Sequence, residues 1–95
     1  MLICRVTGTA VATVKKEQLR NHKLLVVRQA TLDNELVGDP FVAVDTVGAG
    51  SGEVVLVTRG SAAAEAGLHG RGPIDAAIVA ILDSLSTDGE VVFRK

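Results

Sequence analysis

Apolar and polar residues alternate over most of the segment 2–14, LICRVTGTAVATV. A period of two places successive side chains on opposite faces, which predicts a half-buried β-strand. Gly8 interrupts the run, and a glycine inside a strand often marks a bulge or a sharp bend of the kind that small barrels need. The predicted apolar face consists of Leu2, Cys4, Val6, Ala10, Ala12 and Val14, and the polar face carries Arg5, Thr7, Thr9 and Thr13.

Three further segments have the composition of strands. After the polar segment 15–23, residues 24–32 (LLVVRQATL) predict a strand that is apolar on both faces at its start. A turn-rich loop with Gly38 and Pro40 separates it from a short strand over 41–45. Residues 53–59 (EVVLVTR) predict a fourth strand. The pattern therefore favours a mainly β protein.

One short helix is expected at about residues 61–66, within GSAAAEAG. Ser61 is a suitable N-cap, the alanines of 62–66 are strong helix formers, and Gly67 is a natural terminator. The helix would precede the fifth main strand.

The segment 74–85, IDAAIVAILDSL, fits a helix as well as a strand by periodicity alone. The β-branched residues Ile78, Val79 and Ile81 favour a strand. Asp88 and Gly89 form a hairpin-type turn before the apolar run 91–93, which predicts a C-terminal strand or arm. Five main strands with a helix between the fourth and the fifth are consistent with an OB-like Greek-key barrel.

The composition indicates one small domain, residues 1–95, that has more apolar side chains than it can bury alone. Hydrophobic residues make up 47% of the chain and aromatic residues only 2%, so the apolar content is mostly Val, Ala, Leu and Ile. The longest uncharged apolar stretch, Ala76 to Leu82, is far shorter than a membrane span. Burial against other copies of the same chain is therefore expected.

Charge and cysteine content exclude several other partners. A net charge of −1, with basic and acidic residues scattered, produces no field that would steer nucleic acid or anionic lipid. The first residues lack the pattern of a signal peptide. Cys4 is the single cysteine and cannot form an internal disulfide, which fits a reducing cytosol. Cys4 is expected to be a small buried apolar residue.

No constellation for catalysis or metal binding stands out. His22 and His69 lie in polar or glycine-rich sequence, and Ser51 lacks a nucleophile motif. One cysteine and two separated histidines have no metal-ligand spacing. Asp45 and Glu53 flank a glycine-rich loop and could form a carboxylate pair, but a pair of this kind is expected by chance among eleven acids. We expect no enzymatic activity, metal or cofactor.

The glycine-rich loop, Gly48 to Gly52, resembles a phosphate-binding loop only superficially. It lacks the G-x-G-x-x-G spacing and leads into a strand, whereas a phosphate loop needs a helix N-terminus. Glycines there allow positive φ and close approach of a neighbour. An OB-type module for nucleic acid or a small ligand is the alternative function, but Phe41 and Phe93 are the only aromatics, which is too few for base stacking.

Five segments in order closely resemble the EutN/CcmL family of microcompartment shell proteins. They are RVTGTAVATVK (5–15), KLLVVR (23–28), VAVDTVGAGSGEVVLV (42–57), GSAAAEA (60–66) and PIDAAIVAILDSL (73–85). The resemblance covers a core of residues 1–85, and 86–95 form a tail that is more variable in the family.

The resemblance implies a five-stranded OB-like barrel that assembles as a cyclic homopentamer, with residues 74–85 as a strand. It implies a structural function in the bacterial cytoplasm: the pentamer caps the vertices of a microcompartment shell whose facets are hexameric proteins. It also implies that Gly48, Ala49, Gly50 and Ser51 lie around the five-fold axis, where side chains of neighbouring copies would collide. Closure of the shell is favoured over conduction through this opening.

Overall fold

A computed structural model describes residues 1–11, 13, 22–60 and 76–95 of the chain. The strands within these residues are β1 (Leu2–Ala10), β2 (Lys23–Gln29), β3 (Phe41–Asp45), β4 (Val54–Arg59), β5 (Ala76–Ile81), β6 (Ser84–Thr87) and β7 (Glu90–Arg94). The helix expected at about 61–66 lies outside the described residues, as do His69 and the start of the segment 74–85.

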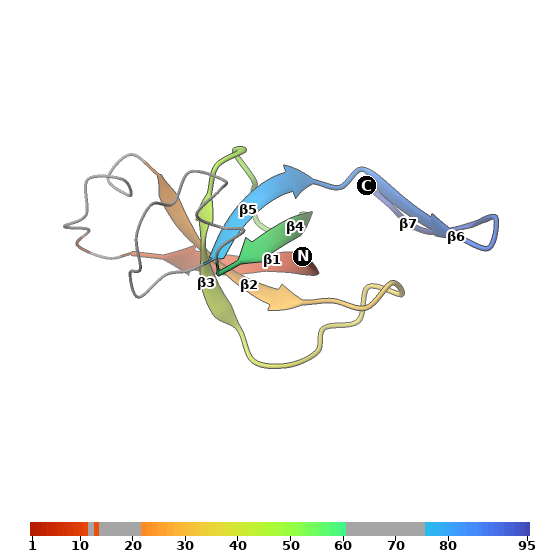
Figure 1. Ribbon diagram of the computed structural model, residues 1–95, viewed down its shortest axis with the longest axis horizontal. Coiled ribbons are helices and arrows are strands. Elements are labelled where there is room, and N and C mark those ends of the chain that lie inside the picture. The colour runs from red at the N-terminus through yellow and green to blue at the C-terminus, as the bar shows by residue number, and fades with distance from the viewer. Residues whose placement is uncertain (12, 14–21, 61–75) are drawn as a thin grey trace.

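Five of the strands form a closed barrel in the order β1-β2-β3-β5-β4 (Figure 1). The barrel closes because β1 pairs with both β2 and β4. All neighbouring strands are antiparallel except β3 and β5, which are parallel and share two residue pairs, Val44 with Ala77 and Asp45 with Ile78. The prediction of a mainly β, OB-like five-stranded barrel is confirmed.

Strand boundaries agree with the predicted ranges in some places and depart from them in others. The third strand occupies the predicted residues 41–45, whereas β1 ends at Ala10. Ala12 and Val14, also predicted for its apolar face, lie outside the described residues. Its last pair joins Ala10 to Leu24, next to the first residue of β2. Among the described residues, no helix has the length and apolar character that crossing a bilayer requires.

A β-bulge interrupts β1 at Gly8, as its position in the run predicted. Val6 pairs with Val27, and Gly8 pairs with the next residue of β2, Val26, so β1 contains one extra residue. The extra residue shifts the alternation by one position. Ala10 was therefore wrongly predicted to share a face with Cys4 and Val6; it packs instead against a second cluster outside the barrel.

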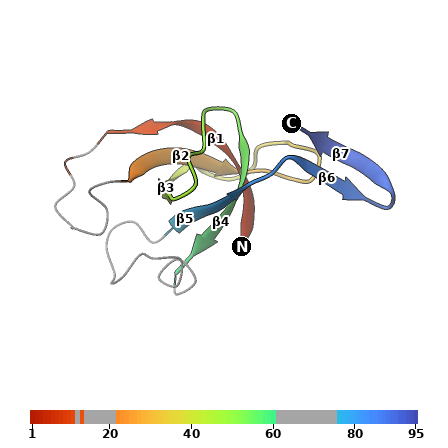
Figure 2. The same cartoon turned by 90° about the horizontal axis from the view of Figure 1, so that it is seen from above.

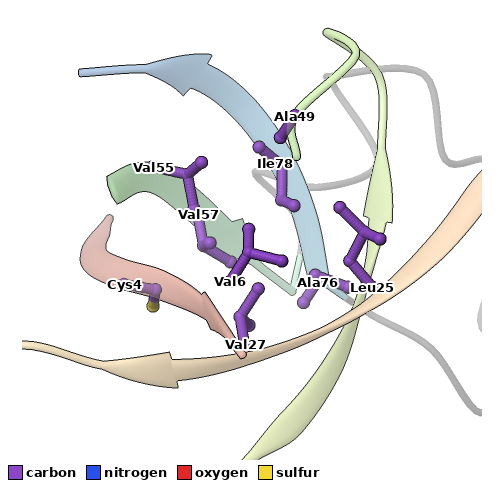
Figure 3. Close-up of a cluster of buried hydrophobic side chains, with 10 residues drawn as sticks. Cys4, Val6, Leu25, Val27, Ala49, Val55, Val57, Ala76 and Ile78 are labelled. Carbon is purple, nitrogen blue, oxygen red and sulfur yellow. The ribbon is translucent and has the colours of Figure 1, made fainter. Parts of the chain in front are cut away.

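The barrel is filled by small aliphatic side chains from all five strands (Figure 3). The buried residues inside it are Cys4, Val6, Leu25, Val27, Ala43, Ala49, Val55, Val57, Ala76 and Ile78. A second cluster forms on the outer face from Leu24, Val44 and Ala77, with Ala10, Val42 and Val79 packed against it. Consecutive Leu24 and Leu25 serve the two clusters, which explains why the start of this strand is apolar on both faces.

Strands β6 and β7 form a separate two-stranded hairpin that extends beyond the barrel in both views (Figures 1 and 2). Its turn contains Asp88 and Gly89 with φ of 52° and 78°, the positive values that a tight type I′ hairpin requires. The predicted turn is confirmed. The segment 74–85, however, is not one strand: β5 ends at Ile81, and Ser84 begins β6.

Candidate functional site

The glycine-rich loop, counted from here on with the preceding Thr46 and Val47, connects β3 to β4 and closes one end of the barrel. Thr46 begins the loop, and its hydroxyl donates a hydrogen bond to the Ile78 carbonyl in β5 at 2.7 Å. The Ala49 side chain is fully buried and belongs to the core cluster, where it lies beside Ile78 (Figure 3). The loop is therefore attached to its own barrel by packing as well as by its two flanking strands.

Asp45, the last residue of β3, anchors the first half of the loop. Its Oδ1 accepts hydrogen bonds from the amides of Val47 at 3.1 Å and Gly48 at 3.0 Å. This is the arrangement by which Asp side chains organise turns. The Lys23 Nζ lies 3.7 Å from Asp45 Oδ2 and donates to the Ala49 carbonyl at 3.1 Å. The Asp45 side chain is only 1% exposed.

Glu53 anchors the second half of the loop. Its Oε1 accepts a hydrogen bond from the Gly50 amide at 2.6 Å, and its own amide donates to the Gly50 carbonyl at 3.2 Å. Its Oε2 lies 2.7 Å from Nζ of Lys95, the residue that follows β7. The hydrogen bond from Lys95, followed by the one from the Gly50 amide, lowers the pKa of the Glu53 carboxyl below its ordinary value.

These contacts decide the phosphate question for the loop. A phosphate loop presents free amides to an anion. Here the Val47, Gly48 and Gly50 amides donate to carboxylates, and the Gly52 amide donates to the Val6 carbonyl at 2.9 Å. An incoming anion would find these four amides already bonded and would meet two carboxylates beside them. The loop is therefore not built to bind phosphate.

The loop glycines differ in why they are needed. Gly48 and Gly52 have φ of +79° and +83°, a backbone region that other residues rarely adopt. Gly50 has no such restriction, but a Cβ there would lie 3.3 Å from Glu53 Oε1. The expected positive φ is thus confirmed at two positions, while the third glycine leaves room for a carboxylate of the same chain.

The four residues predicted to lie at a five-fold axis are not equally accessible. Gly48 and Ser51 are exposed and Gly50 is partly exposed. Ala49 is different, because its side chain points into its own barrel. Ala49 is buried as a whole residue, with 0% of its surface exposed, so the loop would present Gly48, Gly50 and Ser51 to an axis and not Ala49. The sequence did not indicate this restriction.

Other candidates for chemistry have structural roles where the structure describes them. Burial raises the pKa of the Cys4 thiol to about 11, against an opposing effect of Arg59, so the thiol stays protonated and unreactive. His22 is exposed, as expected for a loop histidine. Phe41 packs against the core and has the Arg59 guanidinium 4.6 Å from its ring centroid, so that ring face is not free to stack on a base.

The sequence interpretation missed the two anchors. The sequence offers Asp45 and Glu53 only as a possible carboxylate pair. In the structure Asp45 accepts two loop amides, Glu53 accepts one, and each lies near a lysine. An Asp directly before a turn is a recognisable signal for capping of the turn amides. Nothing in the sequence indicated that Lys95 reaches the loop, because the pairing depends on the path of the hairpin.

The sequence of this chain matches a known protein family. The profile of the family described as "Ethanolamine utilisation protein EutN/carboxysome" matches residues 1–83. The chain belongs to the EutN/CcmL family. The resemblance seen in the sequence is confirmed over nearly the whole chain.

Individual members of the EutN/CcmL family are similar over their full length. The carboxysome shell vertex protein CcmL of Thermosynechococcus vestitus is 46% identical over 95 residues, covering 100% of this chain and 96% of the relative. A solved structure of the ethanolamine utilization protein EutN superposes with a TM-score of 0.88 at 37% identity, covering 100% and 99% of the two chains. The pentameric microcompartment shell protein GrpN of Rhodospirillum rubrum gives 0.79 at 45% identity, covering 92% and 99%.

Proposed function

We propose that this chain is a structural, non-enzymatic protein that assembles as a cyclic homopentamer and caps the vertices of a bacterial microcompartment shell. The observation that carries the proposal is the full-length similarity to proteins named as shell vertex proteins, one of which has a solved structure described as pentameric. The whole chain, residues 1–95, would act as a single domain in the ring.

The surface of the protomer supports self-association. The β6–β7 hairpin extends from the barrel, and a two-stranded hairpin alone is marginally stable in water. Its Leu85, Val92 and Phe93 side chains are only half-buried, and Val91 is 52% exposed. Contact with another copy would cover these side chains. Head-to-tail contacts of this kind close into a ring when the rotation between copies fits.

The segment Gly48 to Gly52 of the glycine-rich loop is the part that we place at the five-fold axis. Gly48, Gly50 and Ser51 would face the axis, and the buried Ala49 would lie behind them in its own barrel. Residues 46–52 carry no charged side chain, so five copies could converge without repulsion between side-chain charges. The two carboxylate anchors hold each loop against its own barrel, which favours simple closure of the shell. The outer rim of the ring would then contact hexameric facet proteins.

Native mass spectrometry tests the ring directly. Five 9.8 kDa protomers give a mass of about 49 kDa. Gly50→Arg is expected to abolish this species if the loop lies at a crowded axis. Gln29→Arg is the matched control, because it adds the same charge at an exposed position at the far end of β2 from Lys23. A wild-type monomer would contradict the pentamer, and a stable Gly50→Arg pentamer would contradict the placement of the loop.

The vertex role needs a second measurement, because a ring alone does not show where it sits. Mixing the pentamer with hexameric facet proteins should convert open sheets or tubes into closed particles visible by electron microscopy. Facets that assemble identically with and without the pentamer would contradict this role.

A further inference from the structure

Lys95 stands where the hairpin returns to the barrel. Its backbone amide donates to the Asp83 carbonyl at 2.8 Å, and the nearby Leu82 amide donates to the Val54 carbonyl in β4 at 2.9 Å. These bonds fix the foot of the β6–β7 hairpin beside the start of β4. The Lys95 side chain can therefore reach the glycine-rich loop from an element that is remote from it in the sequence.

Two carboxylates lie near the Lys95 side chain, and that of Glu53 is much closer than that of Asp83. The Lys95 Nζ is 2.7 Å from Glu53 Oε2 but 4.0 Å from Asp83 Oδ1, and the Asp83 side chain is 87% exposed. Lys23 is the other cation whose charge acts on Glu53. Among the described residues, Lys95 is thus the hydrogen-bonding cation of the Glu53 carboxylate.

One carboxylate therefore joins the hairpin to the loop. Oε1 of Glu53 accepts a hydrogen bond from the Gly50 amide, and Oε2 forms the ion pair with the Lys95 ammonium. Because the two oxygens belong to one rigid planar group, fixing one of them orients the other. The side chain of Glu53 is 22% exposed, so packing alone does not hold it in place as fully as it holds the buried Asp45.

We infer that Lys95 is a positioning residue for the glycine-rich loop: it orients the Glu53 carboxylate that holds the Gly50 amide, so that the hairpin and the loop move as one unit. The contacts themselves lie within one chain. If the hairpin docks on another copy, this contact would also restrain the glycine-rich loop at the five-fold axis. That consequence rests on the proposed function.

Amide hydrogen exchange by NMR, read at Gly50, tests the inference in the full chain. Lys95→Met should raise Gly50 exchange about two- to five-fold, a small factor because a solvent-exposed ion pair stabilises only weakly. The midpoint of denaturation should hardly change. Lys95→Arg should restore the wild-type exchange rate, because a guanidinium also donates to the carboxylate.

Arg94→Met is the matched control, since it removes one positive charge from the adjacent exposed position at the end of β7. Gly50 exchange should stay at the wild-type value in this variant. Equal effects of Lys95→Met and Arg94→Met would overturn the inference in favour of a general charge effect. An unchanged Gly50 amide in Lys95→Met would overturn it outright.

Variants of Glu53 separate amide positioning from simple charge attraction. Combining Glu53→Gln with Lys95→Met should add little to either change alone, because both interrupt the same link. Exchanging the charges, with Glu53→Lys and Lys95→Glu together, restores an ion pair but removes the acceptor for the Gly50 amide. Gly50 exchange should then remain raised, and a return to the wild-type rate would contradict the inference.

Failure of this inference is distinguishable from failure of the proposed function. Native mass reports whether the protein is a pentamer, and all the variants at positions 94 and 95 are expected to keep the wild-type mass. A protein that is monomeric but shows the predicted Gly50 response would contradict the ring and retain the link. A pentamer without that response would support the ring and contradict the link between Lys95 and the loop.

Discussion

The two ends of the glycine-rich loop use the same chemistry in different surroundings. At each end a carboxylate accepts hydrogen bonds from loop amides, two at Asp45 and one at Glu53, and lies near a lysine. The Asp45 side chain is buried and its ion pair is long, at 3.7 Å, whereas that of Glu53 is partly exposed and its ion pair is short, at 2.7 Å. The difference indicates that burial in the barrel fixes the Asp45 side chain. The Glu53 side chain depends more on its ion pair with Lys95, which solvent and pH can weaken.

The largest effect is expected from Asp45→Ala. This change removes the acceptor of two amides next to the core and should lower the free energy of unfolding by about 2 to 4 kcal/mol. Asp45→Asn keeps an oxygen acceptor and should cost only about 1 kcal/mol. Chemical denaturation measures both. A loss from Glu53→Ala as large as that from Asp45→Ala would contradict the contrast between the two ends.

An intermediate effect is expected from the glycines beside each anchor. Gly48→Ala places a Cβ at φ +79° and should cost about 1 to 2 kcal/mol. Gly50→Ala has no such strain and only presses on the end of the Glu53 side chain, so its cost should be about 0.5 kcal/mol or less. The same denaturation experiment compares them. The reverse order would show that crowding by Glu53 outweighs backbone strain.

The smallest effect is a pH dependence confined to the Glu53 end. The pKa of Glu53 in the folded protein is below its ordinary value of 4.5, mainly because Lys95 donates to it. The Glu53 carboxylate therefore contributes fully to the free energy of unfolding at pH values above 4.5. This contribution is lost as the pH falls through the lower pKa that Glu53 has in the folded protein. The stability difference between wild type and Glu53→Gln should shrink to zero over this acidic range. A difference that persists at lower pH would exclude the ion pair as its source.

The barrel was predictable because its strands are marked locally. Strands and hairpin turns have local sequence patterns: alternation of apolar and polar residues, β-branched residues, and turn residues such as Asp88 and Gly89. These patterns can be read from one sequence without knowledge of the tertiary structure. The division of the segment 74–85 was not predicted. Asp83 and Ser84 are turn-forming residues, but the apolar pattern continues past them to Leu85 and hid the break. The shift at Gly8 was signalled, but its effect on Ala10 depends on how the partner strand pairs.

The candidate loop was recognised from its glycines, yet its internal order was not. A glycine-rich loop suggests exposure, and the burial of Ala49 depends on the barrel end that the loop covers. The pairing of Lys95 with Glu53 joins residues far apart in the chain. Contacts of this kind follow from tertiary structure, so the sequence pattern did not contain them.

The parallel pairing of β3 with β5 has a consequence for how the protein is made. Strands β1 to β3 can pair as soon as they are synthesised, but the barrel cannot close until β5 inserts between β3 and β4. Such long-range pairing is slow to form, because distant parts of the chain must first meet. We therefore expect barrel closure to wait until β5 has been synthesised. Incomplete chains on the ribosome would then lack the closed surface that other copies contact.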